Sequence, residues 1–223
     1  MSAYGPAALG PARASGAVIT VENASFEDGL TGWTAGGAAA TEVSSTTITW
    51  QYPDVPDGTH WLMINAGAHH VNYAWQQVGT VNASQTYTLT FTAGNSVVSN
   101  TSAPYFYAGL YTDDGIGGIA NTPLAQISDA DVTWTQVAPD DTQRDDIVTG
   151  NATVTFDASA APQEAGKNLY IFFSSKPNGW YNHTLFDAVT LNGTTVPEPA
   201  SAAILLGLGG MGLLTGRGQQ RKA

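Results

Sequence analysis

Histidine and carboxylate residues could support catalysis, but their spacing along this chain assembles no recognisable active site. His69 and His70 are adjacent, so along a strand their side chains would point to opposite faces, which is poor geometry for a shared metal ion. No Gly-x-Ser-x-Gly, His-Glu-x-x-His or phosphate-loop motif occurs. Acidic doublets such as Asp113-Asp114 lie in polar stretches, where two solvated carboxylates have similar environments. We therefore expect no enzyme, and glycan hydrolysis is the enzymatic alternative that the plentiful Asp and Glu leave open.

Aromatic side chains offer a different chemistry, because flat rings stack on the apolar faces of sugars. In residues 72–78 and 105–111 the aromatic side chains alternate with smaller apolar ones, which places most of the rings opposite the expected core side. A further ring follows a predicted Asn-Gly turn at 178–179. The alternative is structural, since aromatic residues favour strands in any β-protein. The predicted carbohydrate-binding residues are Tyr73, Trp75, Tyr105, Tyr107 and Trp180.

Such side chains need strands to position them, and alternation with a period of two recurs from residue 18 to 195. It is clearest in Tyr-Thr-Leu-Thr-Phe-Thr at 87–92 and in Leu-Tyr-Ile-Phe-Phe at 169–173. Pairs such as Asp57-Gly58 mark turns between the strands. No stretch of this region has convincing helical periodicity. The pattern predicts an all-β fold, a β-sandwich of many short strands.

Charge limits the partners of this domain. The chain has 7 Lys and Arg against 18 Asp and Glu, for a net charge of −11. Between residues 18 and 196 the Lys and Arg residues are Arg144, Lys167 and Lys176. Such a surface repels phosphate backbones, so we expect no nucleic-acid binding. It tolerates Ca²⁺, which prefers oxygen ligands.

The last 28 residues, 196–223, differ from the rest of the chain. Val196, Pro197, Glu198 and Pro199 end the preceding strand, since proline donates no backbone hydrogen bond. Residues 200–215 carry no charge and predict an apolar helix that could enter a membrane. A basic end formed by Arg217, Arg221 and Lys222 follows, which favours a cytoplasmic C-terminus.

These three parts, in this order, resemble the PEP-CTERM sorting signal. The resemblance implies that an integral-membrane exosortase processes the chain near Pro197-Glu198-Pro199. It also implies that the protein is held transiently in the inner membrane by its C-terminal helix. From there it would pass to the cell surface or extracellular matrix of a Gram-negative bacterium.

Export requires an N-terminal signal, and residues 1–17 contain no apolar run of the usual length. Ala12-Arg13-Ala14 does resemble a small-residue cleavage site. We interpret this segment as a signal-peptide remnant left by a start codon assigned too late. The alternative is that this copy is not exported.

The order of motifs in residues 18–195 resembles the galactose-binding-like jelly roll of carbohydrate-binding modules. The resemblance begins with Asn23-Ala24-Ser25-Phe26-Glu27-Asp28-Gly29 and ends with Phe186-Asp187-Ala188-Val189, where the family usually has Asn at position 188. The first and last strands of such a sandwich lie side by side, which brings Glu27 close to Asp187. The resemblance implies a structural Ca²⁺ ion held by Glu27, Asp187 and the loop around Asp57. Alternatively, Glu27 caps a turn and Asp187 bonds backbone amides.

The sequence thus predicts a jelly-roll sandwich followed by a sorting tail with one hydrophobic helix. We expect a non-catalytic surface or matrix protein that acts in adhesion or in association with exopolysaccharide. A dedicated carbohydrate-binding module is the alternative.

Overall fold

Strands form nearly all the regular structure in the computed structural model, which describes residues 15–37, 43–47, 53–66, 71–95, 104–113, 123–136, 148–176 and 182–196. Two antiparallel sheets contain all the strands within these ranges, as the sequence predicts for an all-β sandwich. Residues Ser15–Thr195 make up one compact unit, and Met1–Ala14 with Val196–Ala223 make up a second unit.

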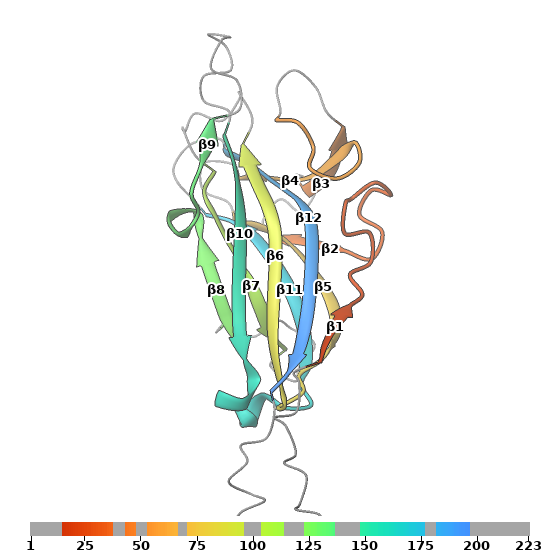
Figure 1. The fold of residues 1–223 in the computed structure, drawn as a ribbon. Helices are drawn as coiled ribbons and strands as arrows, with labels where there is room; N and C mark the ends of the chain where they lie inside the picture. Colours follow the sequence, from red (N-terminus) through yellow and green to blue (C-terminus); the bar gives the residue numbers. More distant parts are fainter. Residues whose placement is uncertain are drawn as a thin grey trace, which may run out of the picture. The chain divides into compact units, whose positions relative to one another are not determined.

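The first sheet has seven strands in the order β3-β4-β12-β6-β10-β9, with β1 also paired to β12. In Figure 1 the long strands β12, β6 and β10 run next to one another in this sheet. Its strands are β1 (Gly16–Ile19), β3 (Val43–Thr47), β4 (His60–Ala66), β6 (Gln85–Asn95), β9 (Thr135–Gln136), β10 (Val148–Asp157) and β12 (Asn182–Thr195).

The second sheet has five strands in the order β2-β5-β11-β7-β8, with β11 at its centre. It forms the other layer of the sandwich, behind β6 and β12 in the view of Figure 1. Its strands are β2 (Thr34–Gly37), β5 (Asn72–Thr80), β7 (Phe106–Thr112), β8 (Ala125–Ser128) and β11 (Asn168–Ser175). In the described part of the chain, three short 3₁₀ helices lie between strands: η2 (Asp129–Asp131), η3 (Ala158–Ala160) and η4 (Pro162–Glu164).

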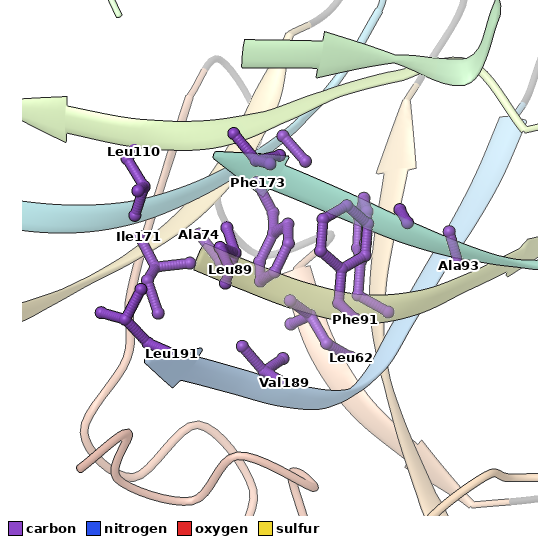
Figure 2. Close-up of a cluster of buried hydrophobic side chains, with 14 of the residues drawn as sticks. Leu62, Ala74, Leu89, Phe91, Ala93, Leu110, Ile171, Phe173, Val189 and Leu191 are labelled. Carbon is purple, nitrogen blue, oxygen red and sulfur yellow. The ribbon is translucent and has the colours of Figure 1, made fainter. Parts of the chain in front are cut away.

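The core lies between the two sheets and follows the predicted alternation. Leu89 and Phe91 of β6 project inward from one sheet, and Ile171 and Phe173 of β11 meet them from the other (Figure 2). Phe173 and Phe186 stack with ring centroids 4.4 Å apart. Complete burial of such side chains stabilises the fold by about 1.5–3 kcal/mol each.

The first and last strands of the domain pair with each other, as the resemblance implies. Gly16 is opposite Thr194, and the Thr195 amide donates to the Ser15 carbonyl. β1 thus begins slightly before residue 18, where the sequence patterns place the start of the domain. The amino and carboxyl ends of the domain therefore leave it from the same place, directly ahead of the tail.

A bulge interrupts β12 between Asp187 and Thr190. Ala188 has a positive φ of 50°, and the Val189 amide leaves the ladder to bond the Ala24 carbonyl at 3.1 Å. Asn adopts this backbone region more readily than Ala, so the residue that the resembled family usually has here would fit the bulge with less strain.

Within the described ranges, no helix has the length and apolar character needed to cross a membrane. The predicted helix over 200–215 lies outside these ranges, as do residues 1–14.

Candidate functional site

Glu27 holds the loop that precedes β4. Its Oε1 accepts the backbone amides of Thr59 at 2.6 Å and His60 at 2.7 Å. Its Oε2 accepts the Thr59 hydroxyl at 2.8 Å and lies 3.2 Å from Nδ1 of His60. Hydrogen bonds led by the Thr59 amide lower the pKa of Glu27 to about 2. Gly58 has a φ of +82°, and a Cβ there would collide with the Glu27 carboxylate, so this position needs glycine.

Asp187 lies under the same loop and is fully buried. Its Oδ2 accepts the Asp57 amide at 2.9 Å, whereas its Oδ1 is buried without a hydrogen-bond partner. Burial, helped by the charges of Asp57 and Glu27, raises the pKa of Asp187 to about 7, although backbone hydrogen bonds from Ala188 and Asp57 act in the opposite direction. The loop that contains Asp57 thus links Glu27 and Asp187, and both carboxylates bond its backbone amides, as the alternative to the ion states.

The buried Oδ1 of Asp187 is costly to leave without a partner, and it is an oxygen ligand of the kind that Ca²⁺ prefers. No group of three or more His, Asp or Glu side chains in the described ranges could hold a metal ion. An ion next to Asp187 would therefore need backbone carbonyls for most of its ligands, which Ca²⁺ accepts readily.

The second candidate region is the outward side of the five-stranded sheet. Its aromatic residues alternate along β5, β7 and β11 with buried core residues such as Ala74, Leu110 and Ile171. We call this surface the aromatic face. Its rings are Tyr73, Trp75, Tyr107, Tyr111, Tyr170 and Phe172.

Contacts between strands order these rings. Phe172 of the central strand packs against Tyr73 and Tyr111, with centroids 5.4 and 4.8 Å away. Trp75 and Tyr170 make an edge-to-face contact, with their ring centroids 5.3 Å apart. Tyr73 lies over β2, where a Cβ at Gly36 would collide with its ring. The rings are therefore held by one another and by the sheet.

Exposure differs along the aromatic face. Tyr107 is the most open ring, with 39% of its surface accessible, and Nζ of Lys176 lies 4.7 Å from its centroid. Tyr73, Trp75 and Phe172 are half-buried. Tyr111 and Tyr170 are buried beside them. The face thus presents accessible ring surface on a rigid, buried base.

The structure confirms the predicted outward placement of Tyr73, Trp75 and Tyr107. Tyr105 lies just before β7 and is half-buried, and Trp180 lies outside the described residues. The prediction omitted Tyr170 and Phe172, although the alternation with Leu169, Ile171 and Phe173 could have identified both.

Comparison with known proteins identifies the tail. Residues 195–222 match the family described as the PEP-CTERM protein-sorting motif. This motif is an exosortase recognition signal for export and surface sorting in Gram-negative bacteria, so the chain is an exported protein. Val196 is the only motif residue among Val196, Pro197, Glu198, Pro199, Arg217, Arg221 and Lys222 that lies in the described ranges. No curated protein matches the sequence.

Solved structures resemble the sandwich. A cyclase from Fischerella sp. TAU matches with a TM-score of 0.60 and 18% identity, covering 82% of this chain and 99% of the cyclase. A Stig cyclase from the same organism, in complex with an indole compound, matches with a TM-score of 0.59 and 19% identity. This match covers 82% of this chain and 100% of the cyclase. TmCBM61 in complex with β-1,4-galactotriose matches with a TM-score of 0.48 and 13% identity, covering 77% of this chain and 95% of TmCBM61. At these identities the cyclase matches concern the fold alone.

Proposed function

We propose that this exported chain is a non-catalytic protein of the cell surface or extracellular matrix, and that its sandwich associates with polysaccharide through the aromatic face. In this proposal the sandwich is a galactose-binding-like jelly roll. The apolar helix at 200–215 holds the chain in the inner membrane until an exosortase processes the tail. The observation that carries the proposal is the row of six rings on one side of a single sheet.

The geometry of these rings supports sugar binding. Side chains on adjacent strands are held in a fixed arrangement, so little conformational entropy is lost when a ligand binds. The accessible rings of Tyr73, Trp75 and Tyr107 lie on β5 and β7, on either side of the central β11. A sugar chain could therefore contact more than one ring at the same time.

A structural Ca²⁺ ion near Asp187 belongs to the same proposal. The ion would satisfy Oδ1 of Asp187 and neutralise its buried charge, while Glu27 holds the loop through Thr59 and His60. Its role would be to fix the loop from 53 to 60 against β12. It would take no part in chemistry on a sugar.

A glycan panel tests the proposal. The full-length protein, in a non-ionic detergent without a sugar headgroup, would be applied to immobilised neutral and acidic polysaccharides. We expect saturable binding to at least one glycan. Failure to bind any glycan would reject sugar recognition and favour adhesion by protein contacts. Release of reducing ends by the bound protein would instead favour the hydrolase alternative.

A further inference from the structure

Polar side chains gather at one end of the aromatic face. Asp113 directly follows β7, Asn168 begins β11, and Gln77 lies late in β5. These three strands are adjacent in the sheet, so the polar residues converge although they are far apart in sequence. The neighbouring residues Thr112 and Leu169 are buried, which places Asp113 and Asn168 on the outward side.

Hydrogen bonds connect these side chains. Nδ2 of Asn168 and the hydroxyl of Tyr170 both donate to Oδ2 of Asp113, the second at 3.3 Å. Nε2 of Gln77 donates to Oδ1 of Asn168 at 3.0 Å. Tyr170 in turn contacts the ring of Trp75. The network is therefore continuous with the aromatic rings.

The network retains binding capacity. Within the described part of the chain, Oδ1 of Asp113 and Oε1 of Gln77 accept no hydrogen bond. No lysine in that part neutralises Asp113, because Lys167 pairs with Glu164 and Lys176 with Asp129. A half-exposed carboxylate with a free oxygen is a strong acceptor for hydroxyl groups, since hydrogen bonds to charged groups are the stronger ones.

This chemistry selects among ligands. A sugar ring that rests on Trp75 would place its hydroxyl groups within reach of acceptors at this end of the face. A uronate or sulfate group there would be repelled by Asp113, which no lysine of the described ranges neutralises, and by the acidic domain around it. Neutral rings with donor hydroxyl groups satisfy both conditions.

We infer that Gln77, Asp113, Asn168 and Tyr170, together with the ring of Trp75, form a subsite that recognises the hydroxyl groups of a neutral sugar and excludes anionic glycans. This inference rests on the proposed function, because it names the ligand class of the same face. Asp113 is the residue that determines the specificity, and Asn168 and Tyr170 are positioning residues that hold its carboxylate.

A matched pair of polymers tests the subsite. Homogalacturonan in its fully methyl-esterified and fully de-esterified forms has one backbone and differs in charge, and neutral galactan and xylan extend the neutral set. The full-length protein should bind at least one neutral polymer and not the de-esterified one. Asp113→Asn should weaken neutral binding about tenfold or more and reduce discrimination against the anionic polymer.

Control variants separate the possible failures. Asp157→Asn removes one charge from an exposed position on the other sheet and should leave the binding unchanged. A thermal melt shows whether Asp113→Asn perturbs folding. If it does, Gln77→Ala still tests the subsite, because it alters an exposed side chain and should weaken glycan binding. Binding that is lost in Trp75→Ala but equal to wild type in Asp113→Asn and Gln77→Ala would overturn the subsite alone. Absence of glycan binding in the wild type would overturn the proposed function and the subsite together.

Discussion

Glu27 and Asp187 come from opposite ends of the domain, yet their carboxylates bond backbone amides of the same short loop. Asp187 accepts from Asp57, and Glu27 accepts from Thr59 and His60. The pairing of β1 with β12 brings the two ends together. The two carboxylates differ in their surroundings. Glu27 is exposed and both of its oxygens accept hydrogen bonds, whereas Asp187 is buried and its Oδ1 has no hydrogen-bond partner.

Calcium should stabilise the protein through Asp187. Adding Ca²⁺ at a hundredfold excess over its dissociation constant should raise the free energy of unfolding by about 2.7 kcal/mol. Asp187→Asn should abolish this increase, and the control Asp157→Asn should keep it. Thermal melts with Ca²⁺, Mg²⁺ or a chelator measure the effect. A wild-type melting temperature that is the same with Ca²⁺ and with a chelator would reject the ion.

Without Ca²⁺, stability should decrease as the pH rises from about 4 to about 7. Folding raises the pKa of Asp187 from 3.8 to about 7, so over this interval the folded state binds a proton that the unfolded state lacks. Glu27 acts in the opposite direction, since its lowered pKa contributes stability that is lost as the pH falls toward 2. Urea midpoints in a chelator should thus be higher at pH 5 than at pH 8. An equal decrease in Asp187→Asn would assign the effect to other groups.

Removing an accessible ring should reduce glycan binding without unfolding the domain. Trp75→Ala and Tyr107→Ala should each weaken binding by about 1–2 kcal/mol, because each removes apolar contact area from the aromatic face. Val18→Ala, at a position 80% exposed on β1, is the matched control. Affinity electrophoresis measures the change, and variants that bind as tightly as wild type would place the ligand elsewhere.

Glycine at position 188 should stabilise the bulge in β12. Ala188 has a φ of 50°, which costs an L-residue with a Cβ about 1 kcal/mol and costs glycine almost nothing. The larger entropy of glycine in the unfolded chain offsets about 0.5–1 kcal/mol of this strain, so Ala188→Gly should raise the free energy of unfolding by up to about 0.5 kcal/mol. Ala152 in β10 does not have a positive φ, so Ala152→Gly should instead lower the free energy of unfolding by a similar amount. Chemical denaturation measures both, and a loss in Ala188→Gly would contradict the strain argument.

The sorting motif should control processing of the tail. Replacing Pro197, Glu198 and Pro199 with alanine should leave the full-length chain in the membrane fraction of a Gram-negative host that has an exosortase. Thr194→Ala, in the last strand before the motif, should be processed normally. Immunoblots of membrane and extracellular fractions compare them, and normal processing of the triple variant would show that the motif is not read.

The sequence alone was sufficient for the long alternating strands, their inward residues and the sorting tail, because each depends on residues that are close together in the chain. Leu89 and Phe91 alternate with threonines, and alternation of side chains is a local property of an extended strand. The Pro-Glu-Pro motif, the apolar run and the basic end are likewise contiguous.

Only the tertiary structure decided which distant residues meet. Alternation could place Tyr73 and Tyr107 outward, but the strand order β5-β11-β7 was needed to put Phe172 and Tyr170 between their strands. The convergence of Asp113, Asn168 and Gln77 has no local signal, since Asp113 follows β7 whereas Asn168 and Gln77 lie on β11 and β5. The burial of Asp187 depends on a loop from a distant part of the chain, because desolvation is set by the groups that pack over a carboxylate.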